Sequence, residues 1–375
     1  MKIATWVSNT YKTPPPPEVI RAPQVIAAQI VDGLVQKGHR VTLFAAEGSQ
    51  TKAKLETAGL SPLSKKTSFD FSLRTQTEFA IAYEMTLASK MIKLAKERNF
   101  DIVHAHSTLR VIHFSSLIDI PFVYTLHIPL DLHPKDVGAE ERVFYERFVL
   151  DYYKNTTNNY FIAISESQKK TFPGLNWAGV IHHGIDLKTF NFSDQQGEYL
   201  AVAGRIIPEK GFDIAIEISR RLGIPLIIAG SHSQEYPKYW QEKIKPYVDG
   251  KNIRFAEMLS GRHYVDFLSK AKAFLMPIKW TEPFGLVMVE AMACGTPVVA
   301  FNRGSVPEII KEGETGFIIK PGDINGMAKA VKKIHLMPRS QYQAMRRACR
   351  RHIEKNFTIE KMVDGYEKVY QKILS

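Results

Sequence analysis

The sequence predicts an α/β protein with two domains, each built on a parallel sheet that is covered by helices. Short apolar runs rich in β-branched residues alternate with longer segments of helical periodicity, and this alternation is typical of parallel α/β sheets. Several of the short runs are apolar at nearly every position, as expected for strands that are buried on both faces. The 375 residues suffice for two or three domains at roughly 100–200 residues each.

The first half of the chain contains six strand-like runs and two segments with the spacing of an amphipathic helix. The strand-like runs are Lys2–Val7, Arg40–Ala46, Asp101–His106, Pro121–His127, Tyr160–Ser165 and Gly179–His182. The helical segments, Val25–Lys37 and Ala80–Arg98, lie between strand-like runs and are therefore expected to cover the sheet. We assign residues 1–190 to an N-terminal α/β domain.

The second half repeats this pattern. Its strand-like runs are Tyr199–Ala203, Pro225–Ala229, Ile253–Ala256, Ala273–Pro277, Pro297–Phe301 and Gly316–Ile319. A helix is expected at Asp213–Leu222, and the polar stretch Lys188–Gly197 separates the two halves. We therefore assign residues 191–355 to a C-terminal α/β domain. The remaining segment, residues 356–375, contains an amphipathic pattern over Ile359–Leu374 that predicts a final helix.

Net charge and cysteine content restrict the partners and the compartment. The 50 Lys and Arg against 38 Asp and Glu give a net charge of +12, which favours anionic partners such as phosphates or acidic lipids. The sequence has no zinc-finger spacing, RNA-binding aromatic signature or basic zipper, so nucleic acid is not expected. The two cysteines, Cys294 and Cys349, build no disulfide framework. Together with an N-terminal segment unlike a signal peptide, they predict a cytoplasmic protein.

The stretch Pro277–Glu308 is the most informative part of the sequence. A loop with Glu282 and Gly285 precedes a short predicted helix, Leu286–Ala293, and Glu290 lies about one turn inside that helix. Both glutamates can therefore face the same end of the sheet, next to the free N–H groups of the helix start. This combination suits a polyhydroxylated, phosphorylated ligand. The spacing of the two glutamates alone favours two solvated charges, and the surrounding sequence is what makes a site of them.

A second candidate site follows the first strand of the C-terminal domain, within Ala201–Phe212. Arg205 comes directly after the strand, and Lys210 precedes the next helix. The forked guanidinium and the mobile ammonium could hold a diphosphate without a metal ion. The alternative is a pair of ordinary surface cations. The segment is neither a Walker A loop nor a glycine-rich dinucleotide-binding turn.

Histidines form a third group at the ends of predicted strands in the first half. His104, His106 and His127 lie at or near carboxyl ends, where ligands of parallel sheets bind. No acidic residue lies at the close spacing of a metal site, and the sequence has no Asp-x-Asp motif. No metal site is therefore predicted.

These motifs resemble the retaining glycosyltransferases of family 4, which have the GT-B fold of two Rossmann-like α/β/α domains facing across a deep cleft. The family pattern E-x7-E within EPFG…EAMACGTPVV is matched at Glu282–Val299, and GR-x4-KG is matched at Gly204–Gly211. Val180–Phe190 is similar to the interdomain segment of the family, and Lys37–Phe44 to a motif of its first domain. The resemblance implies that the segment 356–375 packs back on the N-terminal domain.

The resemblance also implies how a donor is bound. Glu290 would bind the ribose of a nucleotide-diphosphate sugar, and Glu282 would contact the sugar. Arg205 and Lys210 would hold the diphosphate. The family also uses backbone groups of the loop after the first glutamate, here those of Phe284, Gly285 and Leu286.

The implied reaction is transfer of the sugar with retention, by front-face attack, without a metal ion or other cofactor. The donor is most often a uridine diphosphate sugar, and the acceptor is a glycan, a lipid or a small molecule. His127 matches the first-domain histidine near the reacting centre, and His106 is an additional candidate. The sequence departs from the family in the first loop, where Arg21 and Ala22 replace two glycines.

Three other functions remain open from the sequence, and so do the roles of two segments. The chain could be a GT-B-like sugar-nucleotide epimerase or glycan phosphorylase, or a non-catalytic nucleotide-sugar-binding protein. The basic stretch Lys332–Lys355 could place the protein on the inner, anionic face of the membrane, or it could be a solvated helix face. The aromatic segment Val143–Tyr153 could line an acceptor groove or belong to the core.

Overall fold

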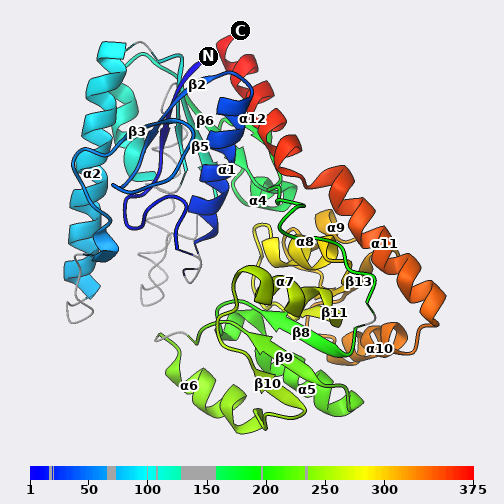
Figure 1. Cartoon of the computed structure of the whole chain (residues 1–375). Helices are drawn as coiled ribbons and strands as arrows, with labels where there is room; N and C mark the ends of the chain where they lie inside the picture. Colours follow the sequence, from blue (N-terminus) through cyan, green and yellow to red (C-terminus); the bar gives the residue numbers. More distant parts are fainter. Residues whose placement is uncertain are drawn as a thin grey trace. The chain divides into compact units, whose positions relative to one another are not determined.

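The computed structural model describes residues 1–16, 19, 21–65, 73–98, 100–106, 109–127, 158–195, 197–232 and 235–375 (Figure 1). They form two compact units. The first unit is Met1–His182 together with Ile359–Ser375, and the second is His183–Thr358. The sequence predicts these boundaries at 190/191 and 355/356. The difference arises because the chain before residue 191 is held by the second unit: Arg350, which lies inside the helix Arg339–Asn356, donates to the Phe190 carbonyl oxygen at 2.6 Å.

Among its described residues, the first unit has a seven-stranded parallel sheet with the order β3-β2-β1-β4-β5-β6-β7. The order reverses between β1 and β4, so the carboxyl ends of these two strands flank the switch point where ligands of such sheets bind. β3 was not predicted, because its three residues are half-exposed at the sheet edge and form no apolar run. The strands are β1 Lys2–Trp6, β2 Arg40–Phe44, β3 Lys54–Glu56, β4 Ile102–Ala105, β5 Phe122–Leu126, β6 Asn159–Ala163 and β7 Trp177–Val180.

The last helix of the chain, α12, lies beside the first helix, α1, on this sheet (Figure 1). Gly33 of α1 permits the close approach, because a Cβ there would lie 2.5 Å from Cγ2 of Val363. Lys37 fixes the pair with ion pairs to Asp364 (2.8 Å) and Glu367 (2.7 Å). The helices of this unit are α1 Ala22–Gln36, α2 Leu73–Arg98, α4 Glu166–Thr171 and α12 Ile359–Leu374, with 3-10 turns η1 Leu63–Lys65 and η2 Leu109–Leu117.

Within its described part, the second unit has a six-stranded parallel sheet with the order β10-β9-β8-β11-β12-β13. Its switch point lies between β8 and β11. The loops after these two strands contain most of the candidate residues from the sequence. The strands are β8 Tyr199–Ala203, β9 Leu226–Ala229, β10 Ile253–Phe255, β11 Ala271–Met276, β12 Val298–Phe301 and β13 Gly316–Ile319.

Two glycines delimit the helix that follows β8. Gly211 and Gly223 both have positive φ, so a side chain at either position would be strained. Gly211 also lies against the carbonyl oxygen of Pro277, which brings the loop after β11 to the start of this helix. The helical elements of the unit are η3 Pro208–Lys210, α5 Phe212–Leu222, α6 Pro237–Tyr239, η4 Trp240–Ile244, η5 Lys245–Tyr247, α7 Gly261–Ser269, α8 Leu286–Ala293, α9 Val306–Ile309, α10 Ile324–His335 and α11 Arg339–Asn356.

Part of the basic stretch seen in the sequence is internal. Arg346 is fully buried and donates to the carbonyl oxygens of Ser193 and Ser269, each at 2.8 Å. Arg350 is half-buried and donates to the carbonyl oxygens of Phe190, Ala293 and Leu187. The basic residues that remain exposed are Lys332, Lys333, Arg339, Arg347, Arg351 and Lys355. In the part of the chain that the structure describes, no helix has the length and apolar character needed to cross a bilayer.

Candidate functional site

The candidate site of the second unit lies at the carboxyl ends of β8 and β11. Lys210 comes from the turn before α5, and Glu282 from the loop after β11. The Lys210 ammonium lies 2.6 Å from Glu282 Oε2, and both side chains are largely buried. The sequence singled out these two residues in separate motifs. The strand order makes them neighbours, because β8 and β11 are adjacent in the sheet.

Trp280 completes this contact, and the sequence analysis missed it. Its indole N–H donates to Glu282 Oε2 at 3.0 Å. The Lys210 ammonium lies 4.9 Å from the centroid of the indole ring, which is within the range of a cation–π interaction. The available signal was a single large aromatic residue two positions before the first glutamate of the E-x7-E motif.

The loop after Glu282 is fixed by its backbone. The Ser305 amide donates to the Glu282 carbonyl oxygen at 3.0 Å, and its hydroxyl donates to the Phe284 carbonyl oxygen at 2.6 Å. Gly285 has φ +81° and forms the cap from which α8 begins at Leu286. The first turn of α8 therefore presents its backbone N–H groups at the same end of the sheet as Lys210.

Glu290 lies within α8 and is half-buried. The Tyr264 hydroxyl donates to its Oε2 at 2.8 Å. Burial raises the pKa of Glu290 from 4.5 to about 7, and the hydrogen bond from Tyr264 only partly opposes this. Near neutral pH, the carboxyl group is therefore divided between its charged and neutral forms.

Arg205 follows β8 and is exposed. No hydrogen bond or ion pair joins its guanidinium to another residue that the structure describes. It is therefore available to an anion that arrives from solvent, whereas Lys210 is already paired with Glu282.

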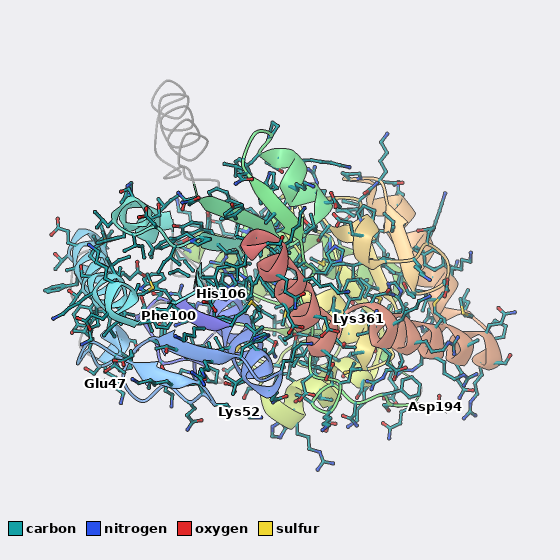
Figure 2. All side chains as sticks on the ribbon, turned by 90° about the horizontal axis from the view of Figure 1, so that it is seen from above. Glu47, Lys52, Phe100, His106, Asp194 and Lys361 are labelled. Carbon is teal, nitrogen blue, oxygen red and sulfur yellow. The ribbon has the colours of Figure 1, made fainter. Side chains whose placement is uncertain are left out.

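The first unit contains a buried histidine cluster at the carboxyl ends of β4 and β5 (Figure 2 shows His106 inside this unit, with Glu47 and Lys52 at its outer edge). His106 Nδ1 lies 3.1 Å from His127 Nε2. Burial lowers the pKa of His127 to about 3, so its imidazole is neutral at physiological pH.

His104 supports this pair from below and connects it to the C-terminal helix. Its ring lies 3.8 Å from that of His106, between centroids. Its Nε2 lies 2.9 Å from the Thr125 hydroxyl, and its Nδ1 is hydrogen-bonded to the Tyr370 hydroxyl of α12. Burial, and to a lesser extent the nearby His127, hold the pKa of His104 well below its usual value. The C-terminal helix therefore contributes to the packing of the histidine cluster.

The candidate residues are thus divided between the units: His106 and His127 belong to the first, and the remaining candidates to the second. Across the described residues, no group of three or more His, Cys, Asp or Glu has the arrangement of a metal site.

In the first loop, where the family glycines are replaced, the Gln24 side-chain amide donates to the carbonyl oxygens of Ser8 and Tyr11. The aromatic segment 143–153 lies outside the described residues.

Two family models match the chain. The model described as "Glycosyl transferases group 1" matches residues 186–352, and that of "Glycosyltransferase Family 4" matches residues 24–189. Glycogen synthase of Mycobacterium tuberculosis is 29% identical over 302 residues, which cover 75% of this chain and 71% of that protein. N-acetyl-alpha-D-glucosaminyl L-malate synthase of Bacillus anthracis is 25% identical over 317 residues, covering 78% of this chain and 80% of that protein.

Solved structures share the fold over the whole chain. Sucrose-phosphate synthase of Thermosynechococcus elongatus has a TM-score of 0.76 at 16% identity and covers 100% of this chain and 99% of its own. HepE of Anabaena in complex with UDP-glucose has a TM-score of 0.68 at 19% identity, with 100% of this chain and 98% of its own covered. At these identities the likeness shows the fold of the chain and nothing beyond it.

Proposed function

The chain belongs to glycosyltransferase family 4 and has the GT-B fold, and from this premise we propose that it moves a sugar from a uridine diphosphate sugar to a glycan, lipid or small-molecule acceptor, with retention and without a metal ion. The observation that carries the proposal is the Lys210–Glu282 pair at the switch point of the second sheet. It combines a cation for the diphosphate with a carboxylate for the sugar hydroxyls.

The proposed chemistry needs little more than stabilisation of developing charge. The bond between the anomeric carbon and the diphosphate oxygen breaks while the acceptor oxygen bonds to the same face of that carbon. The acceptor proton passes to the departing phosphate oxygen. Lys210 and Arg205 offset the negative charge that grows on the leaving group, and fixed charges of this kind contribute several kcal/mol in comparable sites.

The other candidates receive roles that fit their environments. Glu290 accepts hydrogen bonds from the ribose hydroxyls, and the amides at Gly285 and Leu286 contact the donor beside it. His127, kept neutral by burial, offers a hydrogen bond to the donor sugar without adding a positive charge near the anomeric carbon. His106 orients His127 through their 3.1 Å contact.

The names of relatives support the choice of donor. Glycogen synthase and N-acetyl-alpha-D-glucosaminyl L-malate synthase are among the similar proteins, and HepE has been solved with UDP and with UDP-glucose. The HepE complexes support a nucleotide-sugar donor, and the different products in the two synthase names leave the acceptor class broad.

The proposal is tested by a thermal-shift screen of nucleotides and nucleotide sugars. A ligand that binds only the native protein raises its melting temperature. At a hundredfold excess over Kd, such a ligand adds about 2.7 kcal/mol to the free energy of unfolding. We expect UDP and at least one UDP-sugar to stabilise the protein. Incubation with donor alone then separates the enzyme classes: a transferase releases UDP slowly by hydrolysis, whereas an epimerase changes the sugar. Stabilisation by no nucleotide sugar would refute the proposal.

A further inference from the structure

Trp280 lies in the loop after β11, two residues before Glu282, and is half-buried. Its two contacts join the residues that are proposed to bind the two halves of the donor. The indole N–H donates to Glu282 Oε2 at 3.0 Å, and the face of the ring lies 4.9 Å from the Lys210 ammonium.

Both hydrogen-bond donors of Glu282 converge on one oxygen. Lys210 and Trp280 both contact Oε2, at 2.6 and 3.0 Å. Among the residues that the structure describes, none donates to Oε1. The carboxylate is therefore anchored by one oxygen, and the other remains available to a hydroxyl group of a bound sugar.

The indole N–H matters as a second hydrogen-bond donor to Glu282, because Lys210 is proposed to contact both Glu282 and the diphosphate. When a diphosphate binds, the Lys210 ammonium is drawn toward it and its contact with Glu282 weakens. A carboxylate whose side chain is only 9% exposed would then lose its charged partner, and an uncompensated buried charge is strongly unfavourable. The indole is neutral and is not drawn toward the diphosphate. Its N–H therefore still donates to Glu282 Oε2 and keeps the carboxylate in place.

The backbone on both sides of Trp280 is held independently of the indole. The Lys279 amide donates to the Glu209 carbonyl oxygen at 2.7 Å, and the Ser305 amide donates to the Glu282 carbonyl oxygen at 3.0 Å. The Lys279 ammonium also pairs with Asp213 at 3.0 Å. Replacing the side chain at position 280 should therefore leave the path of the loop intact.

We propose that Trp280 is a positioning residue of the donor site: its N–H fixes Glu282 so that Oε1 meets a hydroxyl of the donor sugar, and its ring face keeps the Lys210 ammonium in reach of the diphosphate. The inference rests on the proposed function and deepens it. The indole N–H acts on the sugar through Glu282, and the ring face acts on the diphosphate through Lys210.

The division is tested with two variants and two probes, UDP and UDP-glucose, by calorimetric titration and by the rate of UDP release from UDP-glucose. Trp280→Phe keeps a ring face and removes the N–H. Loss of a hydrogen bond to a charged group should lower the rate of UDP release at least about 10-fold, while the Kd of UDP stays within about twofold. Trp280→Leu removes the ring as well, so it should show the same loss of rate and also weaken UDP binding by roughly 2- to 30-fold.

The matched control is Trp177→Phe in the first unit, which removes an indole N–H that donates to the Phe172 carbonyl oxygen at 3.0 Å. It should leave both probes and the rate unchanged. Wild-type rate and wild-type UDP-glucose affinity in Trp280→Phe would overturn the inference, as would equal losses of UDP and UDP-glucose affinity in that variant. Failure of the unmodified protein to bind UDP would instead overturn the proposed function, so the two failures are distinguishable.

Discussion

Replacing Glu290 by glutamine should stabilise the protein at alkaline pH, although it changes a residue of the proposed donor site. The Glu290 carboxyl is half-buried in α8, and burial raises its pKa to about 7. In the unfolded chain, the same group ionises near its ordinary value of 4.5. A glutamine has a similar shape and still accepts the hydrogen bond from Tyr264, but it has no charge to bury.

The sign and the size follow from the two pKa values. Between pH 4.5 and about 7 the folded protein holds a proton that the unfolded chain has released, so the stability of the wild type falls as the pH rises through this window. Below the window the glutamate carries no penalty, and above it the penalty is complete. The difference between the two pKa values, at 1.36 kcal/mol per pH unit, corresponds to about 3 kcal/mol. Because Glu290 is partly exposed, this is an upper value.

The assay compares melting temperatures of the wild type and Glu290→Gln by scanning calorimetry at pH 5 and pH 8. Domains of this size shift by about 2–4 °C per kcal/mol, so the advantage of the variant should grow by up to roughly 6–12 °C between the two pH values. Glu198→Gln, at an exposed position before β8, is the control and should show no such growth. An advantage of Glu290→Gln that is the same at pH 5 and pH 8 would refute the reasoning.

Three further outcomes are expected. Lys210→Ala and Glu290→Ala should each lower the rate of UDP release from the donor at least about 100-fold without changing the circular dichroism spectrum, because each removes a strong donor contact; near-normal rates in both would exclude the proposed donor site. The rate should persist in excess EDTA, and its loss with recovery on addition of Mg²⁺ or Mn²⁺ would contradict the metal-free mechanism. Gly285→Ala should lower the stability by about 1–2 kcal/mol, since φ is +81° and the added Cβ would lie 2.7 Å from Met288 Cε; an unchanged melting temperature would show that the loop adapts.

The twelve strands predicted from apolar runs are all present. Central strands such as β4, β5 and β11 are buried at every position, and a strand buried on both faces must be apolar nearly throughout. β3 escaped prediction because an edge strand of three residues carries no such pattern. The amphipathic pattern of Ile359–Leu374 predicts that one face of α12 is buried. It does not predict that this face packs against α1. This packing depends on Gly33 and Val363, which are 330 positions apart.

Most residues of the candidate site could be predicted from the sequence, but the contacts between them could not. Lys210 and Glu282 were both singled out, but their 2.6 Å contact spans 72 positions and depends on the adjacency of β8 and β11. Trp280 was not singled out, because an aromatic residue beside a strand end is ordinarily a core residue, and its place two positions before Glu282 is only a weak signal. The raised pKa of Glu290 also depends on burial that the sequence does not show.

Two arginines of α11, one buried and one half-buried, show that part of the positive charge in the second half of the chain is structural. Arg346 and Arg350 donate to the carbonyl oxygens of Cys294 and Ala293, at the carboxyl end of α8. Unpaired carbonyls and the helix dipole make that end favourable for cations. The opposite end of the same helix begins at Gly285 and presents its amides beside Glu282. These two cations thus compensate the negative end of α8, opposite the end at which we propose that a diphosphate binds. Part of the basic stretch of α11 therefore compensates the carboxyl end of α8, and only the exposed remainder could attract an anionic surface.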